Sequence, residues 1–387
     1  MSKTIIHNIG IIVTGNVEKP IAEGDTICTE NNKIVFIGKK ADAPSVVYTT
    51  DIDAKGLTIC PGLIDANTHP PLANYLPSFK AFDWVDNYAG AGITSMVSTG
   101  SFAFPGSAGD IVSAKAQAIF GKYMWDHYHP SFVKIHDSCV MLQKGMVEED
   151  FAELARAGIN VIGEIGLSAV KSPEEAASMS QMAKKHGFIV TLHCAAPTDI
   201  EGIGYTLEEI EHIAPDVLCC TNGDPTPLRE DWIKSLVQSG KYWFDCVSNG
   251  NETLLVKIAG WAKEAGTLGK MLLGTNVPSM SGFSPMGLWI QMAALSQSAE
   301  IDPAIAVAMG SGNVAKCYGL DHGLLAVGMS ADFMFTSTGS IKPDMLSTIA
   351  YGRVPSVAGT FINGKPGLSA CKNMAPPKIR AVITNLV

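Results

Sequence analysis

The sequence lacks the features that would place it outside the class of ordinary globular proteins. It contains no apolar run as long as a membrane-spanning helix, and the start of the chain, MSKTIIHNIGIIVTG, lacks the basic stretch, apolar core and cleavage site of a secretory signal. Its nine cysteines include one adjacent pair, Cys219 and Cys220, but no CxxC motif, which excludes a disulfide framework or a zinc finger. We therefore expect a cytoplasmic protein with reduced thiols and no membrane partner.

Concentrated charge is also missing. The chain has 28 basic and 37 acidic residues, a net charge of −9, and no block of like charges, so nucleic acid and anionic membranes are poor partners. Apolar residues make up 47% of the chain and charged residues 17%, with 38 glycines and 21 prolines, which is typical of a compact protein with many turns. A length of 387 residues suits one large barrel with a small appended domain.

The chain divides by pattern into two kinds of segment. Short β-rich runs at 4–13 and 26–37 are matched by similar runs at 331–337 and 356–367, and neither end alone has enough strands to bury a face. Between them, short apolar runs alternate with helical stretches. The runs lie at 63–69, 92–100, 132–140, 159–166, 188–195, 216–223, 242–247 and 270–276. We predict a (β/α)8 barrel over 61–329 and a small β-sandwich made of 1–60 together with 330–387.

Polar residues gather where these predicted strands end. Alternation sends residues i and i+2 of a strand to the same side, and the ends of barrel strands carry the chemistry of this fold. The polar residues are Asp65, Asn67, His69, Lys134, His136, Glu164, His193, Cys220 and Asn276. We therefore expect them to converge on the mouth of the barrel.

The frame PGLIDANTH, several of these strand ends and the closing segment MGSGNVAKCYGLDHGLLAVGMSADFMF resemble the amidohydrolase superfamily, and the likeness extends over essentially the whole chain. Members are (β/α)8 barrels flanked by a β-sandwich built from both termini. Within the superfamily the chain most resembles hydrolases of cyclic amides. The resemblance implies a homo-oligomer and a small cyclic substrate, for which a carboxylated and an uncharged compound are both open.

The superfamily pattern also implies two divalent metals. They are held by an HxH pair on the first strand, a bridging carboxylate on the fourth and histidines on the fifth and sixth, while an aspartate on the eighth activates water. This chain keeps His69, Glu164 and His193 at matching positions. It departs by carrying Asn67 in the HxH pair, Cys220 (or Cys219, with a slip of one residue) on the sixth strand and Asn276 on the eighth.

Each departure has a chemical consequence. An amide oxygen is a weak zinc ligand, so the metal position near Asn67 and Asn276 is predicted to be lost. Thiolate is a strong zinc ligand, and Glu164, His193 and Cys220 would hold one Zn²⁺ or another divalent metal. The opposite interpretation is also open, in which no metal binds, Cys220 is a small buried apolar residue, and Glu164 and His193 form a structural pair.

The residue that would act as general base also has to be identified. Asn276 stands where the superfamily pattern has the water-activating aspartate, and its amide does not titrate near neutral pH. His69 and His136 are the candidates by position, His193 is a further catalytic candidate, and Asp137 and Asp224 are weaker ones. Asn67, Lys134 and His136 are predicted to contact substrate, with Lys134 pairing either with a substrate carboxylate or with a neighbouring glutamate. Asp65 is interpreted as a structural acceptor.

Three functions remain open at this point. The first is a hydrolase with one metal that opens a cyclic amide or related C–N bond. The second is a metal-free acid and base enzyme, such as an isomerase, cyclase, lyase or decarboxylase, that uses His69, His193 and Glu164. The third is a catalytically silent homologue that binds a ligand or a partner subunit.

Overall fold

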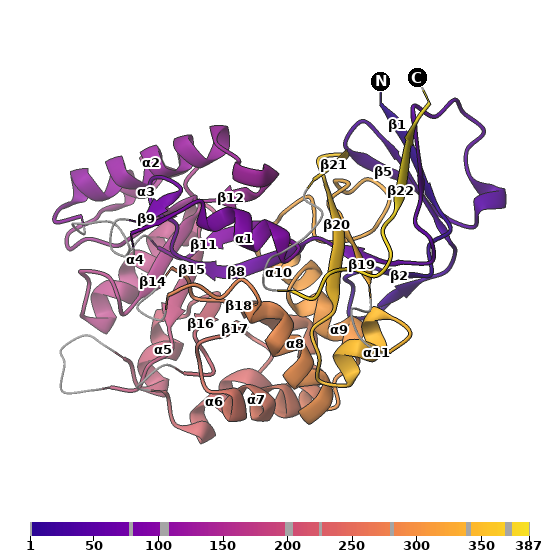
Figure 1. Ribbon diagram of the computed structural model, residues 1–387. Coiled ribbons are helices and arrows are strands. Elements are labelled where there is room, and N and C mark those ends of the chain that lie inside the picture. The colour runs from indigo at the N-terminus through magenta and orange to yellow at the C-terminus, as the bar shows by residue number, and fades with distance from the viewer. Residues whose placement is uncertain are drawn as a thin grey trace.

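The computed structural model describes residues 2–76, 80–100, 108–197, 204–223, 227–278, 282–337, 342–367 and 374–386. Figure 1 shows a barrel of strands surrounded by helices, with a β-rich unit at one side where the first and last segments of the chain lie next to each other. None of the described helices combines the length and the apolarity that a bilayer crossing requires.

Parallel strands form the barrel in two hydrogen-bonded groups. The smaller group has the order β12-β11-β8, and the larger runs in sequence order from β13 to β18. The strands are β8 (Leu63–Thr68), β11 (Ile93–Ser98), β12 (Lys134–His136), β13 (Cys139–Val140), β14 (Val161–Ile165), β15 (Ile189–His193), β16 (Val217–Cys219), β17 (Trp243–Val247) and β18 (Met271–Gly274).

The two groups join into a closed barrel. β12 and β13 are two parts of the third strand, interrupted at Asp137 and Ser138, so the nine segments make eight strand positions. The first and eighth strands meet just beyond β18, where the backbone N–H of Asn276 donates to the carbonyl oxygen of Asn67 at 2.9 Å. The predicted (β/α)8 fold is therefore confirmed.

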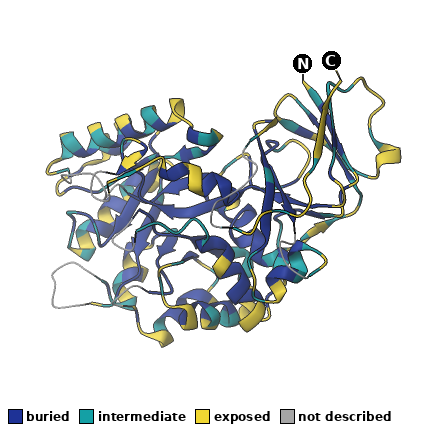
Figure 2. Cartoon of the chain, viewed as in Figure 1, coloured by how far each residue is buried: buried dark blue, intermediate teal, exposed yellow. Residues whose placement is uncertain are grey.

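Helices cover the outside of the barrel. Several begin at residues whose side chains bond the first free backbone N–H groups, as Asp110 does for Ser113 and Thr206 for Glu209. Their inner faces are buried and their outer faces exposed (Figure 2). The helices are α1 (Trp84–Gly90), α2 (Ile111–His127), α3 (Glu148–Arg156), α4 (Pro173–Lys185), α5 (Leu207–Ile213), α6 (Glu230–Gln238), α7 (Glu252–Ala265), α8 (Gly287–Ser298), α9 (Pro303–Met309), α10 (Gly312–Tyr318) and α11 (Met345–Ala350), with short 3₁₀ turns at Lys40–Asp42, Pro130–Phe132 and Leu268–Lys270.

Both ends of the chain contribute strands to each of two further sheets. The first sheet consists of β22 (Val382–Asn385), β6 (Thr50–Asp53), β1 (Lys3–His7), β4 (Thr26–Glu30) and β5 (Lys33–Gly38). The second consists of β21 (Lys365–Pro366), β20 (Ser356–Ile362), β19 (Phe333–Ser337), β7 (Thr58–Pro61), β2 (Ile11–Val13) and β3 (Ile21–Ala22). A separate hairpin pairs β9 (Tyr75–Leu76) with β10 (Ala81–Phe82). The exact domain boundaries at 60/61 and 329/330 stay predictions.

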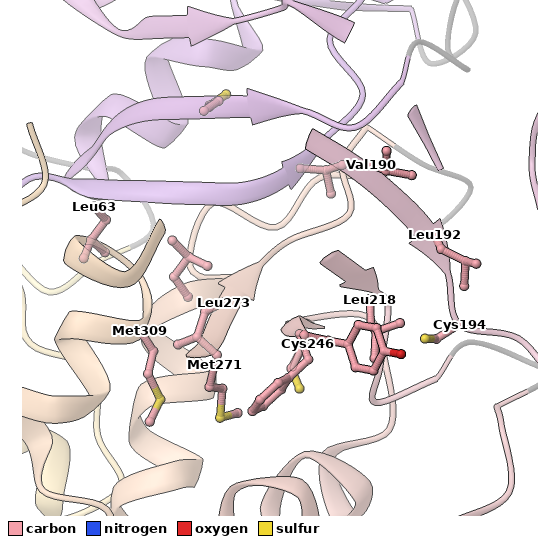
Figure 3. Close-up of a cluster of buried hydrophobic side chains, with 14 of the residues drawn as sticks. Leu63, Val190, Leu192, Cys194, Leu218, Cys246, Met271, Leu273 and Met309 are labelled. Atoms are coloured by element: carbon pink, nitrogen blue, oxygen red, sulfur yellow. The ribbon is translucent and has the colours of Figure 1, made fainter. Parts of the chain in front are cut away.

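Apolar side chains fill the molecule on both sides of the barrel wall. Outside it, residues such as Leu218, Cys246 and Met271 pack between strands and helices (Figure 3). Inside it, a smaller cluster that includes Val97 and Cys219 fills the barrel and is joined by side chains of α10. The barrel is thus a packed core, and polar chemistry is confined to its ends.

Candidate metal and active site

Three potential metal ligands converge at the mouth of the barrel. The ligand atoms of Glu164, His193 and Cys220 lie within 4.8 Å of one another, and all three side chains are buried. Glu164 lies near the end of β14, His193 ends β15 and Cys220 follows β16. Over the described ranges of the chain, this is the only such group of histidine, cysteine and acidic side chains.

The backbone after β16 decides which of the adjacent cysteines joins this site. Cys219 pairs in register with His193 and packs into the interior cluster of the barrel. Cys220 has a φ of 54°, a conformation that residues with a Cβ seldom adopt and that is found preferentially at functional sites. The turn brings Cys220, and not Cys219, to Glu164 and His193.

The carboxylate of Glu164 is fully buried but well supplied with partners. Its Oε2 lies 2.7 Å from His193 Nδ1, and its Oε1 accepts hydrogen bonds from Thr99 Oγ1 at 3.1 Å and from Asn67 Nδ2 at 3.2 Å. Burial raises the pKa of Glu164, but the hydrogen bond and charge of His193 together with the charge of His69 outweigh it and bring the pKa below its ordinary value. Glu164 is therefore an ionised ligand candidate.

Asn67 presents its amide nitrogen to this cluster. Its Oδ1 accepts a hydrogen bond from Thr99 Oγ1 at 2.7 Å, whereas its Nδ2 donates to Asp245 Oδ2 at 2.9 Å and lies 3.8 Å from Cys220 Sγ. The amide oxygen, which is the only ligand atom that the side chain has, is turned towards a hydroxyl. Asn67 thus acts as a hydrogen-bond donor between strands.

Asp245 is the residue of this site that the sequence analysis missed. It lies on β17 and is fully buried, and its Oδ1 accepts a hydrogen bond from the backbone N–H of Cys220 at 2.9 Å. Burial, followed by the nearby charge of Glu164, raises the pKa of Asp245 to about 7. A single carboxylate inside the apolar run YWFDCV was a usable signal, because a buried acid needs partners.

His69 and Asn276 lie side by side next to this cluster. His69 Nδ1 lies 2.7 Å from the carbonyl oxygen of Gly100, and its Nε2 lies 2.7 Å from Asn276 Oδ1 and 3.9 Å from Glu164 Oε1. Asn276 has a φ of 55°, a second left-handed residue at the mouth. The structure therefore brings together six of the predicted residues, namely Asn67, His69, Glu164, His193, Cys220 and Asn276.

Lys134 and His136 are not part of this group, and their predicted position at the mouth is wrong. Lys134 Nζ lies 2.5 Å from Asp332 Oδ2, and the ring of His136 stacks on that of His322 with centroids 5.2 Å apart. The reason is the interruption of the third strand. That strand continues through β13 to Val140, so 134 and 136 belong to its first half, away from the mouth.

Of the three other acids that the sequence analysis names, Asp137 and Asp65 lie within the described residues. Asp137 is buried beside α2, where burial raises its pKa to about 7, and it lines a small pocket with Leu72 and Ala118. Asp224 falls outside the described residues. Asp65 accepts hydrogen bonds from the backbone N–H groups of Thr275 at 2.8 Å and Asn67 at 3.3 Å, which ties the first strand to the eighth.

The side chains of Glu164, His193 and Cys220 are of the types that bind divalent metals. Carboxylate, imidazole and thiolate are all zinc ligands, and catalytic zinc commonly has three protein ligands. Two buried carboxyl groups, Glu164 and Asp245, lie close enough for the charge of one to raise the pKa of the other. A bound cation would offset this repulsion, so the residues present fit such a group.

Comparison with known proteins shows which family the chain is similar to. The amidohydrolase family matches residues 247–367. Enamidase from Eubacterium barkeri is 36% identical over 386 residues, which cover 99% of this chain and 100% of the relative. Imidazolonepropionase from Paenarthrobacter aurescens (strain TC1) is 31% identical over 101 residues, 26% of this chain and 24% of that protein.

Solved structures share the architecture. A crystal structure of enamidase superimposes with a TM-score of 0.94 at 35% identity and covers 99% of this chain and 100% of its own. A β-aspartyl dipeptidase from Fervidobacterium islandicum AW-1 has a TM-score of 0.64 at 16% identity, covering 96% and 98% of the two chains. At that identity the second likeness concerns the fold alone.

Proposed function

This chain belongs to the amidohydrolase family, and on that premise we propose that it is a hydrolase that opens the C–N bond of a small cyclic amide with one bound divalent metal. The observation that carries the proposal is the convergence of Glu164, His193 and Cys220 within 4.8 Å at the mouth of the barrel. The full-length similarity to enamidase supports the cyclic amide as the substrate class.

The metal we propose is zinc, held by Glu164, His193 and Cys220. Zinc at this position would supply Lewis acidity towards the carbonyl oxygen of the substrate. Asp245 and Asn67 contribute by holding the ligands in place. Asp245 accepts from the backbone of Cys220 at 2.9 Å, and Asn67 donates to Glu164 at 3.2 Å.

We assign the general base to His69. Its Nδ1 lies 2.7 Å from the carbonyl oxygen of Gly100, and this acceptor favours a proton on Nδ1 and leaves the lone pair of a neutral ring on Nε2. That Nε2 lies 2.7 Å from Asn276 Oδ1, which is itself an acceptor, so the role of base requires the Asn276 amide to turn its nitrogen towards the ring or to give way to the attacking water. Nε2 then takes a proton from that water and returns it to the leaving nitrogen. Asn276 cannot accept the proton, but its amide can orient the ring.

The prediction that the substrate carries a carboxylate has lost the residue on which it depended. Lys134 was the predicted partner for it, and its ammonium group is 2.5 Å from Asp332. We therefore keep a small cyclic amide as the substrate class without specifying a charged substituent.

One observation favours the metal-free alternative. The amide nitrogen of Asn67 already donates to Glu164 and Asp245, so part of the cluster is satisfied without a cation. An isomerase, cyclase, lyase or decarboxylase on this site would turn over with chelator present and would not add water oxygen to its product. A silent homologue would bind small cyclic amides and turn over none. Membership of a hydrolase family favours the first function over both.

The test combines metal analysis with turnover of a panel of five- and six-membered lactams in ¹⁸O-labelled water. We expect about one zinc per chain, ¹⁸O in the ring-opened acid, and loss of both zinc and turnover in Cys220→Ala. The neighbouring Cys219→Ala is the matched control, since Cys219 lies in the barrel interior, and it should keep both. Full turnover by metal-free protein would refute the proposal.

A further inference from the structure

The residue that follows the second barrel strand, Thr99, lies between two strands that carry residues of the site. Its backbone N–H donates to the carbonyl oxygen of Thr68 at 3.0 Å, and its carbonyl oxygen accepts from the N–H of Glu164 at 3.0 Å. The next carbonyl oxygen, that of Gly100, lies 2.7 Å from His69 Nδ1. The backbone therefore holds Thr99 between the first and fourth strands, whatever its side chain does.

The hydroxyl of Thr99 faces two acceptors inside the site. Its Oγ1 lies 2.7 Å from Asn67 Oδ1 and 3.1 Å from Glu164 Oε1. All three side chains are fully buried, so bulk water cannot take the place of either contact. A hydroxyl has one proton to donate, and an amide oxygen and an ionised carboxylate can only accept it. The shorter distance gives this proton mainly to Asn67, with Glu164 as the second acceptor.

This hydrogen bond helps to determine which end of the Asn67 amide faces the candidate ligands. With Oδ1 directed at Thr99, the amide Nδ2 donates to Glu164 Oε1 at 3.2 Å and to Asp245 Oδ2 at 2.9 Å. The opposite orientation would set the amide oxygen against two carboxyl groups and leave the Thr99 hydroxyl without an amide acceptor. Thr99 and the two acids therefore favour the same orientation.

The two oxygens of Glu164 have different surroundings as a result. Oε2 lies 2.7 Å from His193 Nδ1, on the side of the candidate metal ligands. Oε1 is the oxygen that Thr99 and Asn67 contact. Hydrogen bonds to one oxygen of a carboxylate fix the plane of the group and so direct the other oxygen. Loss of such outer partners typically lowers metal affinity by a factor of about 10–100.

We propose that Thr99 is a positioning residue of the metal site. Its hydroxyl fixes the Asn67 amide, and the two side chains together hold the carboxylate of Glu164 in the direction in which it binds zinc. This inference rests on the zinc site of the proposed function, but it concerns the binding of the metal and not the turnover of a substrate.

The test is the zinc affinity of the full-length protein, measured by competition with a chromophoric chelator, together with the absorption spectrum of the Co²⁺-loaded protein. Thr99→Val keeps the size of the side chain and the backbone hydrogen bonds but removes the hydroxyl, so we expect zinc affinity to fall about tenfold or more. Thr99→Ser keeps the hydroxyl and should bind zinc nearly as the wild type does. The Co²⁺ bands report the ligand geometry, and they should shift in Thr99→Val but not in Thr99→Ser.

Thr94→Val is the matched control. Thr94 lies on β11 (Ile93–Ser98), is as buried as Thr99, and carries a hydroxyl with no hydrogen-bond partner among the described residues. The same substitution there should leave the zinc affinity and the Co²⁺ spectrum unchanged. If Thr99→Val does not fold, Thr99→Ala and Thr99→Ser, which differ only in the hydroxyl, give the same comparison.

The outcomes separate positioning from a purely structural role. A structural role would lower the melting temperature of the chelator-treated variant but leave its zinc affinity and Co²⁺ spectrum as in the wild type. That result overturns the inference, and so does equal zinc affinity in Thr99→Ser and Thr99→Val, or an equal loss in Thr94→Val. A wild type that binds zinc but opens no lactam would contradict the proposed function alone, whereas a wild type that binds no zinc would overturn both.

Discussion

Asn67 Nδ2 donates a hydrogen bond to Asp245 Oδ2 over 2.9 Å, which links the first barrel strand to the seventh across the mouth. In the superfamily pattern the position of Asn67 holds a histidine that binds metal. Here the same position supplies a hydrogen bond, and the other oxygen of Asp245 accepts from the backbone of Cys220. Asn67 and Asp245 therefore hold the remaining candidate ligands in place, at a position where the superfamily pattern has a metal ligand.

Asp245→Ala should destabilise the protein and weaken metal binding. The change removes the buried acceptor of the Cys220 N–H and one of the two carboxylate acceptors of the Asn67 amide, which keeps Glu164, and we expect a loss of about 2–3 kcal/mol in the free energy of unfolding. Asp245→Asn should have a smaller effect because it retains one acceptor oxygen. Denaturant titration measures both. Asp231→Ala is the control: Asp231 is exposed and pairs with Arg229 at the surface, so a change of less than about 0.5 kcal/mol is expected. An equal loss at both positions would contradict the assigned role.

Removing the metal should lower the melting temperature of the wild type. In Cys220→Ser, the same treatment should change the melting temperature much less. A ligand that binds only the folded state adds about 2.7 kcal/mol of stability at a concentration of 100 times its dissociation constant. A hydroxyl is a poorer zinc ligand than a thiolate, so we expect zinc affinity to fall by a factor of about 100 or more. Differential scanning calorimetry with zinc and with chelator gives the comparison. The idea fails if Cys220→Ser and wild type gain the same stability from zinc.

Restoring the superfamily residues should restore a second metal. The double variant Asn67→His, Asn276→Asp places imidazole and carboxylate donors next to His69, whose Nε2 is now 2.7 Å from Asn276 Oδ1. We expect elemental analysis to show about two metals per chain where the wild type has about one. Each single variant is the control and should bind fewer. A double variant that is folded, with unchanged metal content, would show that the superfamily frame does not transfer to these positions.

His136 should make the protein less stable in acid, a contribution opposite in sign to that of the buried acids Asp137 and Asp245, whose pKa values are raised to about 7. Burial, with the nearby cationic groups, lowers the pKa of His136 in the folded protein to about 3, against about 6.5 in an unfolded chain. Between these values the unfolded chain binds a proton at this residue that the folded protein does not, so the contribution of His136 to stability falls as the pH falls from 6.5 towards 3. The slope from one such group is at most about 1.4 kcal/mol per pH unit.

Denaturant titrations between pH 4.5 and 7 test this, because the difference in slope between the wild type and His136→Leu isolates the contribution of His136. On acidification the wild type should lose more stability, or gain less, than His136→Leu. His129→Gln, at an exposed position, is the control and should leave the slope as it is. Identical slopes in the wild type and His136→Leu would exclude His136 as the source.

The sequence by itself determined the fold class and the family. Alternating apolar runs and helices specify a closed parallel barrel because parallel strands need helical crossovers, and the motif frame identified the amidohydrolase superfamily. Most of the site followed for the same reason. Asn67, Glu164 and His193 stand near strand ends, and neighbouring strand ends meet at one mouth.

Only the tertiary structure decided which polar residues reach that mouth. The left-handed turn at Cys220 selected one of two adjacent cysteines, and the break in the third strand left Lys134 and His136 near the opposite end. Asp245 acquired its role through partners far away in the chain, Asn67 and the backbone of Cys220. The sequence pattern predicts which face of a strand a residue occupies. The position of that residue along the barrel axis depends on strand register and local turns, which are set by packing between distant segments.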